Sequence, residues 1–259
     1  MFLLVAKGDD HLRFFYGLIL SFLFVSIAFI LNWLTLDGAT SALLFGTISL
    51  GFGGWTGAGV ILAFFVSSSL VSKDPNDGIT GIKIPFRRNA IQVWANGFWF
   101  SFWILIWFLS QQPLFIVAAI SSMAFSTSDT WASEIGGHRF KGSTWLIKGF
   151  KKVQPGEDGG ISLVGTLASL AGSVFLTFIF WLLSPDYHWG IYLTVVLAGF
   201  LGSFLDSWIG ATLQGKKLYD WVLPIFANKI SVVDNNMTNW LSAGGASIIA
   251  LFIVLFTGT

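Results

Sequence analysis

The chain has 259 residues, of which 54% are hydrophobic and only 10% are charged. Ordinary soluble domains carry about 25% charged residues, so this composition excludes a typical water-soluble protein. The mean hydropathy is +0.75, and 13 Trp and 29 Gly suit a lipid environment, where aromatic residues mark the interfaces and glycine lets helices approach closely. The absence of Cys excludes disulfides and thiolate metal sites. We therefore expect one integral-membrane domain over residues 1–259, an all-α polytopic bundle, with membrane lipids and no nucleic acid as partners.

Apolar stretches of the length of a membrane span recur along the chain. A spanning helix needs about 20 apolar residues. Six stretches reach that length: residues 14–34, 91–110, 113–135, 161–184, 189–213 and 239–256. A seventh, residues 39–71, is too long for one straight span and has a glycine-rich middle. It predicts a broken or re-entrant helix, which survives at membrane depth only where it is buried in protein or lines a wet cavity.

The basic residues predict the orientation. All 14 Lys and Arg fall in four stretches: the N-terminus and the loops around residues 72–90, 136–160 and 214–238. Lys and Arg accumulate on the cytoplasmic side of a membrane. About seven crossings, with residues 39–71 crossing once, place all four stretches on that side. The sequence thus predicts a cytoplasmic N-terminus, an outside C-terminus and, for a prokaryotic protein, location in the cytoplasmic membrane.

Three carboxylates lie inside the apolar stretches: Asp129, Glu134 and Asp206. Ionisable residues in spans are costly and mark functional sites, so these three are the candidate catalytic residues, all in the cytoplasmic half. Glu134 lies about 140° around an α-helix from Asp129, so we expect it to face a neighbouring helix or the helix end. The alternative for Asp206 is a packing face of small residues, with the carboxylate neutralised by a hydrogen bond.

A glycine-rich segment, Pro-Gly-Glu-Asp-Gly-Gly-Ile-Ser at residues 155–162, directly precedes a predicted span. Glycine permits close approach to phosphate, and a helix N-terminus favours its charge. This predicts phosphate binding by Gly156, Gly159, Gly160 and Ser162. Mg²⁺ prefers oxygen ligands, so Asp129, Asp158 and Asp206 are the candidate metal ligands. A turn that only caps the following helix is the alternative.

Basic and amide side chains flank the remaining membrane entries. Arg88, Gln92 and Asn96 are spaced by four and share one helix face. Arginine suits a phosphate, and amides suit its ester oxygens or a nucleotide base. The full predicted set for nucleotide or phosphate binding adds Lys73, Asn89, Asn235, Asn236 and Asn239.

Four motifs in this order resemble one known family. They occupy residues 88–97, 128–134, 155–162 and 202–214. Together they resemble an integral-membrane family long labelled as of unknown function, whose characterised member is the plant phytyl-phosphate kinase. The resemblance implies transfer of a phosphoryl group from a nucleoside triphosphate, CTP in the plant enzyme, to an isoprenoid monophosphate. Glu157 stands where the family pattern has Thr, which puts metal number and donor choice in question.

Two functions fit these residues. Phosphoryl transfer mostly needs positioning and charge neutralisation, which membrane carboxylates with Mg²⁺, a glycine loop and basic loops supply. The alternative is an ion-coupled secondary transporter, in which the broken segment and the carboxylates form a site at the midplane. The one-sided carboxylates and the short outer connections favour the kinase.

Overall fold

The computed structural model describes residues 8–72, 87–139, 142–215 and 233–258, and their long elements are helices. These are α2 (Gly8–Ile30), α3 (Leu36–Val71), α4 (Ala90–Ser110), α5 (Pro113–Trp131), the π-helix η1 (Ala132–Arg139), α6 (Leu163–Leu183), α7 (Trp189–Leu213) and α8 (Asn235–Thr257). Within the described ranges, every long helix except α5 is long and apolar enough to cross a membrane, which gives six candidate spans. The predicted all-α polytopic membrane fold is confirmed, and α7 has the predicted bounds.

Helix α5 forms the centre of the bundle, which explains why it is less apolar than its neighbours. Every residue from 116 to 128 is buried, and the helix packs against α4, α6, α7 and α8. Small and hydroxyl residues let helices pack closely and hydrogen-bond to one another in a membrane. Ser247 of α8, for example, donates to the carbonyl of Ala118 at 3.0 Å. Protein rather than lipid therefore surrounds α5.

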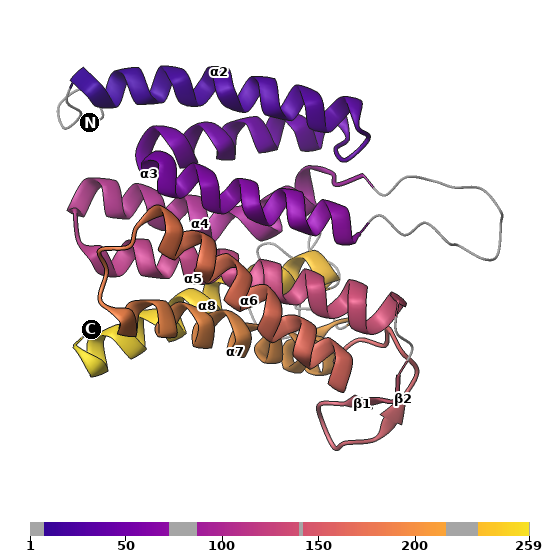
Figure 1. Ribbon diagram of the computed structural model, residues 1–259. Helices are drawn as coiled ribbons and strands as arrows, with labels where there is room; N and C mark the ends of the chain where they lie inside the picture. Colours follow the sequence, from indigo (N-terminus) through magenta and orange to yellow (C-terminus); the bar gives the residue numbers. More distant parts are fainter. Residues whose placement is uncertain (1–7, 73–86, 140–141, 216–232, 259) are drawn as a thin grey trace, which may run out of the picture.

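Helix α3 is broken, as predicted. Gly54 has φ 60° and ψ −156°, a backbone conformation essentially restricted to glycine. Both ends of α3 contact Arg88. The N–H of Thr35, just before α3, donates to the Arg88 carbonyl at 3.1 Å, and the Arg88 guanidinium donates to the hydroxyl of Ser69, near the end of α3, at 2.9 Å. The two halves therefore run antiparallel as a hairpin, visible beside α2 in Figure 1.

This hairpin corrects the predicted topology. Half of the 36-residue α3 is about 27 Å long, close to the hydrocarbon thickness of about 30 Å, so the segment passes through the bundle twice rather than once. The start of α2 and the end of α8 consequently lie at the same end of the bundle (Figure 1). The sequence predicted termini at opposite ends, and this arrangement differs because the reversal at Gly54 adds a pass; the side of the membrane that each end faces stays a prediction.

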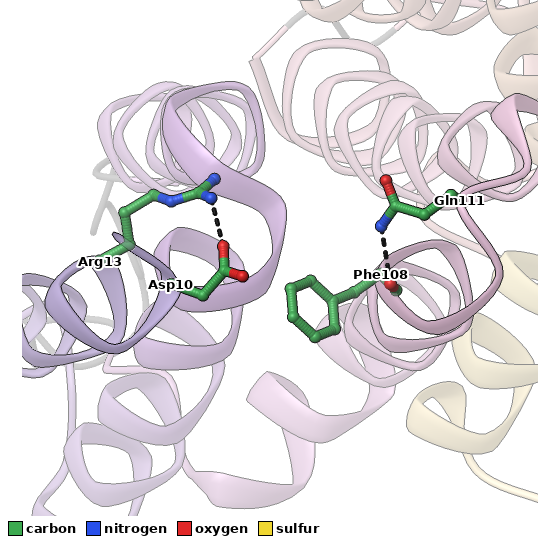
Figure 2. A network of polar contacts seen from close by, with 4 residues as sticks. All are labelled: Asp10, Arg13, Phe108 and Gln111. Carbon is green, nitrogen blue, oxygen red and sulfur yellow. Dashed lines mark hydrogen bonds and ion pairs between the residues drawn. The ribbon is translucent and has the colours of Figure 1, made fainter. Parts of the chain in front are cut away.

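Aromatic contacts hold the start of α2 at this end, which we call the terminal end, and local polar contacts lie beside them. Figure 2 shows the ion pair between Arg13 and Asp10 and the hydrogen bond from the Gln111 side chain to the Phe108 carbonyl, 2.7 Å long. The Phe52 ring lies between Phe14 and Phe108, with ring centroids 5.8 and 5.0 Å away. The kink of α3 and the end of α4 thus flank the start of α2. Arg88 lies at the other end, which we call the site end.

A small sheet that the sequence did not predict lies at the site end. Strands β1 (Thr144–Leu146), β2 (Lys152–Val153) and β3 (Gly160–Ser162) are antiparallel in the order β2-β1-β3. Pairing of Thr144 with Ser162 joins β1 to the residue that precedes α6. The sheet therefore fixes the glycine-rich segment against the bundle.

Candidate active site

A polar cavity of about 390 Å³ opens at the site end, between α5, η1, α6, α7 and the glycine-rich segment. Residues far apart in the sequence meet there. Ten of the predicted site residues line it: Gln92, Asp129, Glu134, Gly156, Asp158, Gly159, Gly160, Ser162, Asp206 and Asn235. We refer to it as the polar cavity.

Two carboxylates from neighbouring helices meet in this cavity. Asp129 near the end of α5 and Asp206 in α7 interact directly through their side chains, and Asp158 is close enough to act on Asp206 electrostatically. Among the described residues, the buried Oδ1 of Asp206 has no hydrogen-bond partner. Adjacent carboxylates repel each other when both are ionised, so a proton or a cation must lie between them.

The donor set fits Mg²⁺ when phosphate completes it. Within the described ranges, no group of three or more His, Cys, Asp or Glu side chains is spaced to hold a metal ion. Asp129, Asp158 and Asp206 thus line one cavity without forming a closed ligand shell. Mg²⁺ in phosphoryl-transfer sites is usually held by one or two carboxylates together with water and substrate phosphates. The unpartnered Asp206 oxygen beside Asp129 meets that requirement.

The π-helix η1 brings Glu134 into the same cavity as Asp129. A π-helix repeats its hydrogen bonds at five residues instead of four, which realigns residues five apart. Both Asp129 and Glu134 line the polar cavity. The structure thus places Glu134 at the helix end, one of the two positions expected for it, and in the same cavity as Asp129.

The glycine-rich segment approaches α7 very closely. Gly159 has φ +76°, and a Cβ there would lie 2.4 Å from the Cβ of Ala211. The N–H of Gly160 donates to the Glu157 carbonyl at 2.8 Å, so this amide closes a turn. Ser162 caps α6 by accepting from Gly165 N at 3.1 Å, in line with the alternative interpretation of this segment. Gly156 lies in the cavity wall with φ +89° and open space around its Cα.

The residues at the start of α4, which the sequence assigned together to nucleotide or phosphate binding, differ in position and role. Asn89 and Gln92 form a capping box, each accepting the other's backbone N–H at 3.0 and 3.1 Å. Gln92 also lines the polar cavity, whereas Arg88 and Asn96 line a second, apolar cavity that Gln92 shares. Asn89 therefore serves the start of the helix, and Gln92 lies at the junction of the two cavities.

Arg88 is a buried cation. Its guanidinium lies 5.8 and 5.7 Å from the ring centroids of Phe64 and Phe65, and it donates to Ser69. Burial lowers the pKa of Arg88 to about 10 against the opposing effect of Glu134, so it stays charged at neutral pH. Among the described residues, no carboxylate forms an ion pair with it. A buried cation of this kind is suited to an anionic ligand.

The remaining predicted residues lie apart from the polar cavity. Asn236 donates to the Asp234 carboxylate at 3.2 Å. Asn239 is buried, and its Oδ1 has no partner among the described residues. Lys73 lies outside the described residues.

The sequence did not predict the hydroxyl groups of the cavity wall or the amide of Gln214. Ser133, Thr144, Thr166, Ser169, Ser203, Ser207 and Gln214 also line the polar cavity. The hydroxyl oxygens of Ser169 in α6 and Ser203 in α7 lie 2.5 Å apart. Their spacing near Asp206 was interpreted only as a packing face, although a hydroxyl beside a membrane carboxylate is also a signal of a polar site.

Comparison with known proteins places the chain among membrane proteins. Residues 19–247 match the family described as Integral membrane protein DUF92. Protein PGR of Arabidopsis thaliana is 31% identical over 80% of this chain and 81% of its own length. An uncharacterized membrane protein of Synechocystis is 32% identical over 76% and 78%, and Protein VTE6, chloroplastic, of Arabidopsis thaliana is 28% identical over 86% and 66%. No solved structure matches.

Proposed function

The chain belongs to the integral membrane protein family DUF92, and from this membership together with the polar cavity we propose that it is a membrane-embedded isoprenoid-monophosphate kinase. The donor is a nucleoside triphosphate, with CTP as the first choice, and the acceptor is a phytyl or other polyprenyl monophosphate. The resemblance to the family of the plant phytyl-phosphate kinase supports this substrate class. The product is the isoprenoid diphosphate.

The observation that carries the proposal is the contact between Asp129 and Asp206 at one end of the bundle, with Asp158 nearby. Phosphoryl transfer places several negative oxygens in one site and depends on positioning and charge neutralisation. An acceptor oxygen of the lipid monophosphate attacks the terminal phosphorus, the bond to the bridging oxygen breaks, and the nucleoside diphosphate leaves. Because the acceptor is already ionised, no strong general base is needed.

Each group of residues has a role in this reaction. Asp129 and Asp206 would hold Mg²⁺, with Asp158 at the cavity wall. When bound, the ion neutralises charge on the phosphates. The chain's own cation, Arg88, is suited to the phosphate of the lipid, and Gln92 lies between the two cavities to orient it. Glu134 lines the same cavity, and its negative charge favours the charged form of Arg88.

The competing transporter needs a polar path to both faces of the membrane. The cavity carboxylates lie at the site end, whereas the buried apolar cluster around Val117, Ile120 and Leu176 lies between the polar cavity and the terminal end. This arrangement favours the kinase. Counterflow of a labelled solute in proteoliposomes would instead support transport.

The basic loops support a cytoplasmic site end. The loops 72–90, 136–160 and 214–238 leave helices at that end, and nucleoside triphosphates are cytoplasmic. With α3 passing twice, this orientation places both chain termini outside.

The test is a kinase assay on detergent-purified protein with Mg²⁺. Each of CTP, ATP, GTP and UTP is paired with phytyl, geranylgeranyl and farnesyl monophosphate, and the diphosphate is detected by mass spectrometry. We expect diphosphate from the wild type, and a loss of at least about 100-fold in Asp129→Asn and Asp206→Asn because a metal ligand is removed. Asp186→Asn, an exposed carboxylate at the terminal end, is the control. Absence of product from folded wild type with every pair would overturn the proposal.

A further inference from the structure

A second cavity, about 450 Å³ and almost entirely apolar, lies between α2, the α3 hairpin and α4. It follows the second half of α3 from Trp55, beside the kink, to the level of Phe64 and Phe65 below Arg88. Trp55 and Phe65, which both line the cavity, are ten positions apart, which corresponds to about 15 Å of helix. The cavity is therefore long and runs from the site end towards the terminal end. We call it the apolar cavity.

Apart from Ser21 in the middle of α2, the polar residues of the apolar cavity gather at its site end. Arg88, Gln92 and Asn96 come from the first two turns of α4 and the residues just before it, whereas the opposite part is lined by Leu50, Trp55 and Leu183. Gln92 lines both cavities, so the site end of the apolar cavity lies next to the polar cavity that holds Asp129 and Asp206. One molecule that fits both cavities must have an anionic head and a long hydrocarbon tail.

The side of the apolar cavity is open to lipid. Leu20, Trp55 and Leu62 line it and are 43%, 70% and 41% exposed. These side chains sit on two passes, α2 and the second half of α3, so a hydrocarbon chain has access from the bilayer without passing through water. Arg88, buried and without a carboxylate ion pair among the described residues, supplies the charge that complements a phosphate.

We propose that the apolar cavity holds the isoprenoid tail of the lipid monophosphate, and that its depth at Ala58 and Gly59 sets the longest tail accepted. This inference rests on the proposed kinase function and adds to it the binding site of the tail and the residues that select its length. Ala58 and Gly59 line the cavity one turn from Trp55, where the Cβ of a substituted Gly59 would lie 2.4 Å from Leu183. The α3 hairpin therefore acts as the wall that limits chain length.

Two substitutions at different depths test this inference. Ala58→Phe fills the deep part, and Ala42→Phe fills the part near the site end, where Ala42 packs against the buried cluster that contains Leu34. Ala171→Phe, an exposed position of α6 outside both cavities, is the matched control. The assay measures kcat/KM for geranyl, farnesyl and geranylgeranyl monophosphate in the full-length purified protein.

The expected pattern differs between the variants. Ala58→Phe lowers kcat/KM for geranylgeranyl monophosphate by about tenfold or more while leaving geranyl monophosphate nearly unchanged, because only the longer tail meets the new ring. Ala42→Phe lowers kcat/KM for all three acceptors, and Ala171→Phe changes none. An unchanged ratio between long and short acceptors in Ala58→Phe would overturn the inference while leaving the kinase intact.

A binding measurement separates this inference from the kinase proposal. Geranylgeraniol carrying a diazirine at its tail end is photolysed with the wild type, and labelled peptides are mapped by mass spectrometry. We expect labels near Trp55 and Leu183 that geranylgeranyl monophosphate displaces and that decrease in Ala58→Phe. Labels spread over lipid-facing helices, or an undiminished label in Ala58→Phe, would show ordinary bilayer contact and overturn the inference. Specific labelling without diphosphate formation would overturn only the kinase.

Discussion

Asp206 is proposed to bind metal, and in the metal-free protein the same carboxylate is expected to destabilise the fold. Its carboxylate lies against that of Asp129, and one of its oxygens has no partner among the described residues. Such a pair is destabilising unless a proton or cation lies between the two groups. Sites that bind metal and phosphate commonly retain this kind of strain, because the ligand relieves it.

We therefore expect Asp206→Asn to raise the melting temperature of the metal-free protein while abolishing phosphoryl transfer. A gain of about 1 kcal/mol corresponds to roughly 2–4 °C in a chain of this size. Melting curves in detergent with EDTA measure it, and Asp186→Asn provides the baseline. A lower melting temperature would mean that Asp206 stabilises the bundle, as the packing-face interpretation requires.

Arg88 and Arg87 are adjacent and differ completely in environment. Arg88 is buried over two phenylalanine rings, whereas Arg87 is exposed and donates to the Asn32 side chain. Lysine cannot reproduce the planar, stacked guanidinium. We expect Arg88→Lys to lower kcat/KM for the lipid monophosphate about tenfold, equivalent to about 1.4 kcal/mol.

Arg87→Lys is the matched control and should retain the wild-type kcat/KM. The same titrations give KM for the nucleotide, which should change little in Arg88→Lys if Arg88 contacts only the lipid phosphate. A rise in nucleotide KM with unchanged lipid KM would assign Arg88 to the donor.

At the scale of elements, the site depends on how closely η1 packs on α6. A Cβ at Gly136 would lie 2.4 Å from the Cα of Gly165, a backbone atom that cannot move aside easily. A Cβ at the next residue, Gly137, would meet nothing closer than 3.9 Å. Gly136 therefore fixes the contact between η1 and the start of α6, and Gly137 does not.

Gly136→Ala should destabilise the protein by about 1–3 kcal/mol, the usual cost of overpacking, and Gly137→Ala should be close to neutral. Thermal unfolding of the two variants side by side measures this difference. Equal melting temperatures would show that η1 does not pack on α6 as described.

The sequence predicted some elements better than others because the signals differ in range. Hydropathy and the cost of a charged group in lipid are local, so the spans and the convergence of Asp129 with Asp206 could be predicted. The π-helical register of η1 depends on hydrogen bonds along the helix and on packing. The position of Glu134 in the same cavity as Asp129 could therefore not be predicted from the sequence. The division of Arg88 and Gln92 between two cavities likewise depends on where α3 folds back, which no residue spacing in α4 reveals.

For the whole molecule, the number of passes decides on which side each terminus lies. If α3 passes once, all four basic stretches lie on one side of the membrane, and the two termini lie on opposite sides. The hairpin at Gly54 instead groups Asp10, Arg13 and the end of α8 at the terminal end (Figures 1 and 2). Lys148, next to the small sheet, lies at the site end. The two topologies therefore make opposite predictions for α2.

The absence of Cys in the chain allows a direct test by single-cysteine labelling. In cells with an intact membrane, a membrane-impermeant maleimide should react with His11→Cys and Asp186→Cys and not with Lys148→Cys, which should react only after permeabilisation. His11 precedes Arg13 on α2, and Asp186 joins α6 to α7 at the terminal end, so a hairpin in α3 requires them to behave alike. If His11→Cys instead behaved like Lys148→Cys, then α3 would cross once, and the charge-based topology would be correct.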